Sequence, residues 1–581
     1  MKKLLFLIGI CAACVTPPPT QETSDLTTLF ERSKGTETPT YSEVISYYQK
    51  LADHSKKISL FEMGSTDAGR PLHLAVYNPE GPTKLSDIHK SKKVRFLINN
   101  GIHPGESDGI DASMLLLRDL IQNDSLQHAY SNSLLCVIPI YNIGGALQRN
   151  SHTRANQNGP KEYGFRGNAR NYDLNRDFIK ADTKNAASFA KIFHLVAPDI
   201  FIDNHVSNGA DYQYAITHLF TQHNKLGSSL GNYLEQTVRP NLEARLAKKG
   251  IPITPYVNVW GSTPKKGWSQ FFDSPRYSTG YTSLFHTLGM MVETHMLKPY
   301  QLRVTQTYEL MGSMLAIAQQ EQSKIKDLRK QAEHYWLGQK KYPIHYQVNK
   351  ETPSALTFKG YEGKYVPSKV TTGQRLFYDR YKPYTETVNY YNTFEPTKYV
   401  EIPKAYVLKS GWNKVVAQLK NNQIQFRTFT KDTVMTAAAL RIENFETRTM
   451  PYEGHYLHYG TQISTTEKTF QFKKGDLYIP TQQIGIRYLL ETLEPAATDS
   501  FFNWNYFDTV LQRKEGFSAY VFEDIAEKLL AEDEELQMAF RKKMTEDADF
   551  AHSPYAQLDY IYKNSPHYEP THMTLPIFKI H

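Results

Sequence analysis

The chain has 581 residues, which predicts two or three domains rather than one. Hydrophobic residues make up 40% of the sequence and aromatic residues 13%, enough for packed cores. The formal net charge of +8 is small for this length, and no block of lysine and arginine stands out, so we expect no nucleic-acid partner.

The first 16 residues have the pattern of a targeting leader. Lys2 and Lys3 form its charged start, residues 4–10 its apolar core, and small residues precede Cys14. The apolar run is too short to span a bilayer. The pattern is similar to a bacterial lipoprotein signal, with Cys14 as the acylated residue. We therefore expect an exported protein, periplasmic or anchored to the outer membrane through Cys14, or alternatively secreted after ordinary signal cleavage.

The sequence contains only three cysteines, Cys11, Cys14 and Cys136. Removal of the leader leaves Cys136 as the one free thiol, so an internal disulfide and a thiolate zinc site are both excluded. Histidine and carboxylate side chains would have to hold any metal. Residues 17–39 are rich in threonine, proline and serine, and we expect them to form a flexible tether.

Between residues 40 and 340, apolar strands alternate with amphipathic helices. Expected strands cover residues 58–64, 72–77, 94–102, 134–140, 200–202 and 290–293. Expected helices cover residues 41–52, 108–122, 184–196, 226–248, 281–288 and 301–338. This alternation predicts an α/β domain with a mixed, mostly parallel sheet and helices on both faces. Ligands of such sheets bind beyond the carboxyl ends of the strands. The polar residues expected at such ends are His103, Asn142, His205 and Glu293.

The sequence changes character after about residue 340. Residues 345–485 are rich in tyrosine and threonine and alternate like strands, with one helix expected near 412–420. Further helices are expected at 482–493 and 521–545. We interpret residues 345–581 as an α+β accessory region that shows no sign of chemistry of its own.

A first candidate site is His103-Pro104-Gly105-Glu106, at the junction of a strand and a helix. An imidazole and a carboxylate three residues apart on such a turn can converge on one ion. His205, at another strand end, is the third candidate ligand, and His194 and His218 are its rivals. Zinc takes three such ligands plus a water molecule when its site is catalytic.

Two further features lie in and beyond the polar segment 146–178. Asn175 and Arg176 place an amide beside a guanidinium, a pair suited to gripping a carboxylate. Glu293 ends an apolar strand, where burial of an unpaired carboxylate is costly. It is therefore either half of a buried ion pair or a general base.

In this chain order, the motifs resemble those of zinc carboxypeptidases of the carboxypeptidase A type, over roughly residues 40–325. The resemblance implies that His103, Glu106 and His205 hold one zinc ion per chain. It also implies that Glu293 is the general base and that Asn175 and Arg176 bind the terminal carboxylate of a peptide substrate.

The resemblance assigns two more roles less directly. An arginine that stabilises the oxyanion corresponds to Arg154, with Arg149 and Arg166 as alternatives, because the loop length differs. A mobile tyrosine corresponds to Tyr281, with Tyr277 as the alternative.

The sequence also departs from the family pattern. Asp177 stands where many relatives carry asparagine, and its charge beside Asn175 and Arg176 could favour basic or unusual substrates. The implied function is a zinc-dependent metallocarboxypeptidase that cleaves C-terminal peptide bonds with a metal-activated water. The alternatives are a cell-wall peptide or small amide hydrolase that uses the same zinc site, and a catalytically inactive binding module.

Overall fold

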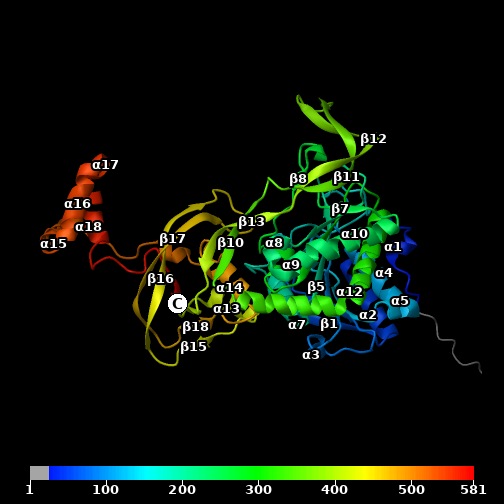
Figure 1. Cartoon of the computed structure of the whole chain (residues 1–581), viewed down its shortest axis with the longest axis horizontal. Helices are drawn as coiled ribbons and strands as arrows, with labels where there is room; N and C mark the ends of the chain where they lie inside the picture. Colours follow the sequence, from blue (N-terminus) through cyan, green and yellow to red (C-terminus); the bar gives the residue numbers. More distant parts are fainter. Residues whose placement is uncertain (1–24) are drawn as a thin grey trace, which may run out of the picture.

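The structure, a computed structural model, describes residues 25–581 (Figure 1). The expected leader and the first part of the expected tether lie outside these residues. Among the helices of this described part, none combines the length and the apolar character needed to cross a membrane.

Residues 25–39 pack against the core, so the prediction of a flexible tether is wrong for this stretch. Helix α1 (Leu29–Arg32) begins with a capping box between Thr28 and Glu31. Its Phe30 is buried and makes an edge-on contact with Tyr300, with ring centroids 5.8 Å apart. Burial of this aromatic ring outweighs the polar composition that suggested a free linker.

The core of the first region, residues 40–340, is an eight-stranded sheet, with two strands, β6 and β7, beyond the six expected. In spatial order its strands are β1 (Ile58–Ser65), β2 (Pro71–Tyr77), β4 (Ser133–Ile138), β3 (Val94–Asn99), β5 (Ile200–Ser207), β9 (Leu288–His295), β6 (Ile216–Phe220) and β7 (Ile253–Pro255). The four central strands, β4, β3, β5 and β9, are parallel. β1 and β2 pair antiparallel, β2 is antiparallel to β4, and β6 is antiparallel to β9. The predicted mixed, mostly parallel sheet is therefore confirmed, and its parallel strands form the centre.

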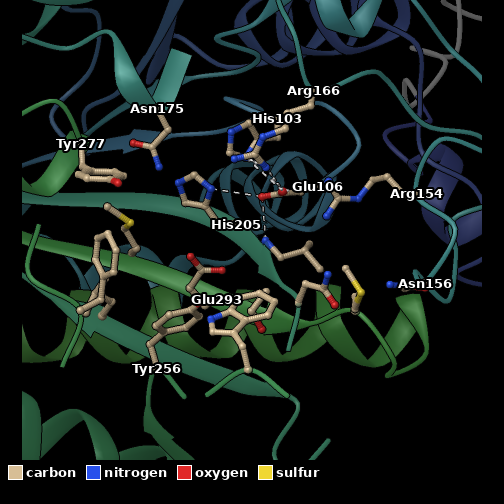
Figure 2. A pocket seen from close by; sticks show the side chains of 18 of the residues that line it. His103, Glu106, Arg154, Asn156, Arg166, Asn175, His205, Tyr256, Tyr277 and Glu293 are labelled. Carbon is tan, nitrogen blue, oxygen red and sulfur yellow. Dashed lines mark hydrogen bonds and ion pairs between the residues drawn. The ribbon is translucent and has the colours of Figure 1, made fainter. Parts of the chain in front are cut away.

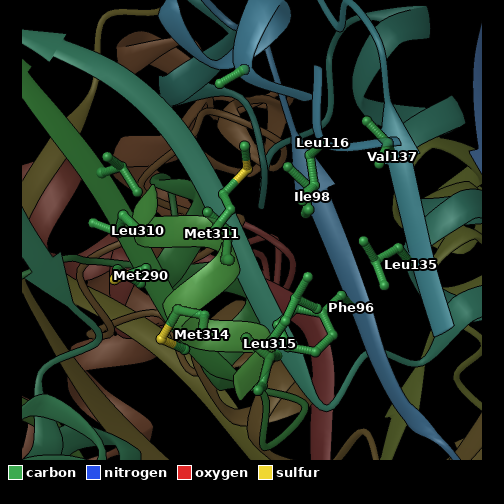
Figure 3. Close-up of a cluster of buried hydrophobic side chains, with 14 of the residues drawn as sticks. Phe96, Ile98, Leu116, Leu135, Val137, Met290, Leu310, Met311, Met314 and Leu315 are labelled. Carbon is green, nitrogen blue, oxygen red and sulfur yellow. The ribbon is translucent and has the colours of Figure 1, made fainter. Parts of the chain in front are cut away.

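Helices cover both faces of this sheet. Alternate residues of β3 point to opposite faces, with Phe96 and Ile98 in one cluster of buried side chains and Leu97 in another. Figure 3 shows Phe96 and Ile98 beside Met311 and Leu315 of the long helix α12 (Tyr300–Leu337). The other helices of this face are α2 (Tyr41–His54), α4 (Asp108–Gln122) and α10 (Arg239–Lys248). The opposite face carries α7 (Lys184–Val196) and α11 (Ser278–Ser283).

The helix expected at 226–248 is interrupted. It consists of α9 (Ser228–Tyr233), a π-helical turn over Leu234–Val238, and α10. The backbone stays helical through Val238 and Arg239, and Pro240 has no N–H with which to continue the regular i→i−4 hydrogen bonds from the preceding turn. The break therefore follows from a proline that the amphipathic pattern alone does not reveal.

The second region is built on a six-stranded sheet of β15 (Arg427–Thr428), β18 (Leu477–Pro480), β14 (Ala405–Leu408), β19 (Thr574–Ile580), β16 (Thr433–Thr447) and β17 (His458–Phe472). Its helices include α13 (Asn413–Asn421) and α14 (Ile486–Leu493). The helix expected at 521–545 is two helices, α15 (Ala519–Glu532) and α16 (Glu534–Glu546). They are separated by Asp533, whose side chain caps α16. An α+β accessory region was expected here.

The two regions share one hydrophobic core. The cluster that contains Phe189 and Leu284 of the first region also contains Tyr406, Leu489 and Trp504 of the second. A long hairpin of β11 (Ser354–Pro367) and β12 (Gln374–Tyr391) projects beside the first region and joins it through β8 (Trp268–Ser269) (Figure 1). The two regions are therefore packed against each other, although the sequence changes in character near residue 340.

Asp111 of α4 is a buried carboxyl group that should make stability depend on pH. The hydroxyl of Thr38 donates a hydrogen bond to it over 2.6 Å, and Tyr300 donates a second. No basic side chain of residues 25–581 lies within ion-pair distance of it, and burial raises its pKa from the ordinary 3.8 to about 7. The folded state therefore favours the neutral acid, and stability is lost as the pH rises from about 4 to about 7.

We expect Asp111→Asn to remove this pH dependence. The free energy of unfolding of the variant should exceed that of the parent at pH 8 by at most about 4 kcal/mol, and the two should converge near pH 4. Urea unfolding at several pH values would measure the difference. An equal effect of the substitution at pH 4 and pH 8 would contradict a raised pKa at Asp111.

Candidate active site

A pocket of about 520 Å³ opens at the carboxyl ends of the central strands (Figure 2). The residues that line it all fall between His103 and Met296, in the first region of the chain. Its polar lining includes His103, Glu106, Arg154, Arg166, Asn175, Arg176, His205 and Glu293. The loops after β3 and β5, the polar segment and strand β9 therefore bring the predicted site residues together, with the exception of Tyr281.

His103 and Glu106 lie on a tight turn between β3 and α4. The N–H of Glu106 donates to the carbonyl of His103 over 2.8 Å. Gly105 is required inside the turn, because a Cβ there would lie 2.5 Å from the Arg154 side chain and 2.9 Å from the Gly164 carbonyl oxygen. The turn therefore presents both side chains toward the pocket and leaves room for the arginine beside them.

Three potential metal ligands meet in this part of the pocket. His103 Nδ1 lies 3.1 Å from Glu106 Oε1, and His205 Nδ1 lies 3.2 Å from Glu106 Oε2. One ligand atom from each residue falls within 4.8 Å of the others, and all three residues are buried. Two imidazoles and a carboxylate are a donor set that zinc accepts in catalytic sites.

Each histidine is oriented by a second carboxylate. His103 Nε2 lies 3.0 Å from Asp173 Oδ1, and His205 Nε2 lies 2.9 Å from Asp203 Oδ2. These contacts fix both rings and leave both Nδ1 atoms facing Glu106. Such outer carboxylates are typical of metal-binding histidines, so the residues present fit a metal ion. Asp203 was not predicted, although its place two residues before His205 on one strand puts both on the same face.

The rival histidines lie elsewhere. His194 packs edge-on against Phe285, and its Nε2 lies 3.4 Å from the amide oxygen of Asn422. His218 Nε2 contacts Glu243 Oε1 at 2.9 Å. Neither residue lines the pocket.

The charged groups of the His103, Glu106 and His205 cluster strongly shift one another's pKa values. Burial raises the pKa of Glu106, but His103, Arg154 at 3.0 Å and hydrogen bonds from both histidines outweigh it and hold the pKa well below its usual range. Burial lowers the pKa of His205, but Asp203 and Glu106 raise it well above its ordinary value. Glu106 is therefore ionised at any ordinary pH, as a metal-binding carboxylate must be.

Two of the three candidate arginines reach the pocket. Arg154 contacts Glu106, and Arg166 lies 2.8 Å from Asp173 Oδ2 and 3.6 Å from Glu106 Oε1. Arg149 instead donates hydrogen bonds to the carbonyl oxygens of residues 38 and 39, away from the pocket. Arg154 and Arg166 thus remain candidates for stabilising an oxyanion.

Asn175 and Arg176 lie side by side at one wall of the pocket. The Asn175 side-chain oxygen accepts a hydrogen bond from the N–H of Ser278 over 3.1 Å, so its amide nitrogen is the end that faces the pocket (Figure 2). The guanidinium of Arg176 stacks over the ring of Tyr277, 4.6 Å from the ring centroid. Both groups can therefore donate to a carboxylate in the pocket, and we call this pair the carboxylate clamp.

Asp177 does not belong to this wall. It is fully buried, lies 2.6 Å from Lys180 Nζ, and accepts hydrogen bonds from the N–H and hydroxyl of Thr183. Its charge is neutralised behind the clamp. The expectation that Asp177 favours basic substrates therefore has no structural basis.

The tyrosine at the pocket is Tyr277, and the expectation of Tyr281 needs correction. Helix α11 begins at Ser278, so Tyr281 lies one turn inside it and faces the core. Its ring packs 5.5 Å from those of Phe193 and Phe285, and its hydroxyl donates to Asn422. Tyr277 caps the helix and lines the pocket.

Glu293 lies beside His205 at the edge of the sheet. The two residues are paired in register on the parallel strands β9 and β5. Burial raises the pKa of Glu293 to about 7, assisted by Glu106 and opposed by His205. Among residues 25–581, no basic side chain lies within ion-pair distance of its carboxylate. The buried ion pair considered from the sequence is therefore not formed.

Apolar side chains that the sequence did not single out complete the pocket. Leu219 and Met291 are cross-strand neighbours on β6 and β9, and Phe271 packs edge-on against Tyr277 at 5.0 Å. Tyr256 and Trp260 come from the loop after β7, and Trp260 is 58% exposed at the rim. Only tertiary structure brings these residues to the strand ends, so no local motif could have revealed them.

Comparison with known proteins gives consistent results. Residues 44–195 match the family model described as zinc carboxypeptidase. Carboxypeptidase 2 of Trichophyton rubrum is 24% identical over 257 residues, a match that covers 40% of this chain and 43% of that protein. The chain thus matches less than half the length of this relative.

Solved metallocarboxypeptidases are also similar. One from Burkholderia cenocepacia is 17% identical, covers 48% of this chain and 68% of that chain, and has a TM-score of 0.36. One from Pseudomonas aeruginosa, in complex with (2-guanidinoethylmercapto)succinic acid, is 15% identical, covers 48% and 69%, and also has a TM-score of 0.36.

The ligand cluster predicts that one zinc ion binds per chain. We expect Asp203→Asn to weaken zinc binding roughly 10- to 100-fold, because it removes the partner that orients His205. His205→Ala should reduce binding further. His194→Ala is the matched control and should bind zinc like the parent. Competition with a chromophoric chelator would give the affinities, and equal affinity of all four proteins would contradict the assigned site.

Proposed function

Since residues 44–195 match the family model described as zinc carboxypeptidase, we propose that this protein is a metallocarboxypeptidase that removes residues from the free C-terminus of peptides. The observation that carries the proposal is the arrangement of one pocket. A His-Glu-His cluster, an unpaired carboxylate and an amide–guanidinium pair all face the same space. Export, with Cys14 as a lipid anchor, is part of the proposal and is based on the sequence.

The pocket offers a residue for each role in metal-assisted hydrolysis. A zinc ion held by His103, Glu106 and His205 would supply Lewis acidity and lower the pKa of a water molecule. Glu293, which is ionised above a pKa of about 7 in the protein alone, would take the proton from the attacking water and pass it to the leaving amine. Arg154 or Arg166 would stabilise the developing negative charge on the carbonyl oxygen.

The proposed clamp defines which end of a peptide enters. A terminal carboxylate placed against Arg176 and Asn175 would direct the last side chain toward Leu219, Met291 and Phe271. Because this part of the pocket offers apolar and aromatic contacts, we propose a preference for C-terminal residues with apolar side chains. The burial and pairing of Asp177 support this choice over basic residues.

The decisive experiment compares matched peptides with free and amidated C-termini. We expect release of the last residue only from the free peptide, with leucine or phenylalanine preferred over lysine, and no release in the presence of a chelator. Chromatography of the released amino acids measures the rates. Equal cleavage of both peptides would instead favour an endopeptidase or a cell-wall amide hydrolase that uses the same cluster.

Glu293→Gln tests the general base separately from metal binding. We expect kcat to fall by about 10²- to 10⁴-fold, because the amide cannot accept the proton, while zinc content stays at one per chain. Steady-state kinetics and metal analysis on the same sample would show this. A variant that keeps full activity would exclude Glu293 as the base.

A further inference from the structure

The accessory region contributes no residue to the lining of the pocket. It nevertheless lies directly behind the wall that carries the amide–guanidinium pair. Two segments form that wall, residues 173–176 and residues 276–278, and each is held by a carboxylate of the accessory region. These contacts link residues 345–581 to the pocket, although the proposed reaction gives those residues no role.

The first anchor is Glu453, in the turn that joins β16 to β17. Its Oε2 atom accepts a hydrogen bond from the backbone N–H of Asp173 over 2.9 Å. The turn is rigid, because Tyr452 and His455 exchange two backbone hydrogen bonds of 2.7 and 3.1 Å. Gly454 has a φ of +78°, and a Cβ there would lie 2.6 Å from the Tyr172 hydroxyl, so the two segments are in close contact.

Asp173 transmits this anchor to the pocket. Its carboxylate accepts a hydrogen bond from the N–H of Asn175 over 2.9 Å and contacts His103 Nε2 at 3.0 Å. It caps the single helical turn that presents Asn175 and Arg176. Glu453 therefore fixes the position of Asp173, and Asp173 in turn orients Asn175 and Arg176.

The second anchor is Asp499, which is fully buried. It accepts hydrogen bonds from the backbone N–H and the Nε–H of Arg276, over 3.0 and 2.8 Å. The Arg276 guanidinium lies over the ring of Trp504, at 5.0 Å. Arg276 immediately precedes Tyr277, the ring on which Arg176 stacks, and Ser278, whose N–H orients Asn175.

A third contact holds residues 177–182, which directly follow the first segment. His455 Nε2 lies 2.6 Å from Asp182 Oδ2, and Lys414 of α13 lies 2.9 Å from the other oxygen of the same carboxylate. Asp182 also pairs with the buried Lys180, which neutralises Asp177. The whole of residues 173–182 is thus clamped between the sheet of the first region and the accessory region.

We propose that the accessory region sets the geometry of the substrate-carboxylate clamp, with Glu453 and Asp499 as positioning residues. The inference builds on the proposed function, because it concerns how that site distinguishes a free C-terminus. Neither residue touches substrate. Each fixes the backbone from which Asn175, Arg176 and Tyr277 project, and a displacement of about 1 Å in such groups can cost 10²-fold in rate.

The test measures binding rather than turnover. Zinc-loaded protein with Glu293→Gln would be titrated calorimetrically with matched peptides that end in a free or an amidated phenylalanine. Glu453→Ala, added to this background, removes the acceptor for the Asp173 N–H. We expect it to weaken binding of the free peptide roughly tenfold and to leave the amidated peptide unchanged. Glu453→Gln keeps an acceptor oxygen and should restore the preference.

Controls separate positioning from general damage. Glu443→Ala, at an exposed position of β16, the strand that leads into the Glu453 turn, should behave like the parent. Asp499→Asn should reduce the preference for the free peptide, since it removes the charge that holds Arg276. Zinc content and melting temperature of each variant would show that the protein remains folded.

The outcomes are distinguishable. A parent that binds both peptides equally would overturn the proposed function and the inference with it. A parent that prefers the free peptide, with the same preference in folded Glu453→Ala and Asp499→Asn, would overturn the inference alone. Loss of the preference in Glu453→Ala, with recovery in Glu453→Gln, supports it.

Discussion

The pocket depends on one buried carboxylate. Glu106 lies among His103, His205 and Arg154 with almost no access to water, and an isolated charge in such a place would be prohibitively costly. Its neighbours must therefore converge on it, and they come from three separate parts of the chain. The N–H of Val206 adds a further hydrogen bond of 2.9 Å. This requirement ties the strand ends, the polar segment and the helix start into a single arrangement.

The parallel centre of the sheet makes this convergence possible. Because β3, β5 and β9 run in the same direction, the residues that follow or end them lie at one edge. Glu293 reaches the pocket by its register opposite His205, without any partner of its own. The sheet thus concentrates charged side chains of both signs at one edge.

The sequence predicted what is encoded locally and in chain order. The sheet follows from alternating apolar strands and amphipathic helices, and His103, Glu106, His205, Asn175, Arg176 and Glu293 all reach one pocket. The choice between Tyr277 and Tyr281 depended on where α11 begins, and periodicity does not fix a helix start to one residue. Leu219 could not be identified, because strand pairing alone brings it to the pocket. Asp203 was missed although it lies two residues before His205 on the same strand.

The remaining errors have the same origin. Polar composition suggested a free tether before residue 40, but Phe30 finds a partner in Tyr300, some 270 residues later in the chain. Asp177 looked like part of the clamp, but Lys180 turns it inward. The contact of Phe30 is with a residue distant in sequence, whereas Lys180 lies only three residues from Asp177. In both cases the direction in which the side chain packs decided the outcome, and a single sequence carries little information about it.

The core shared by the two regions has a consequence for how such a chain can change over generations. Phe189 and Leu284 pack in the same cluster as Leu489 and Trp504, so neither half has an interior of its own on that side. Recombination that exchanged one half for that of a distant relative would join mismatched surfaces. We therefore expect substitutions in this shared core to be tolerated only when they suit both regions at once.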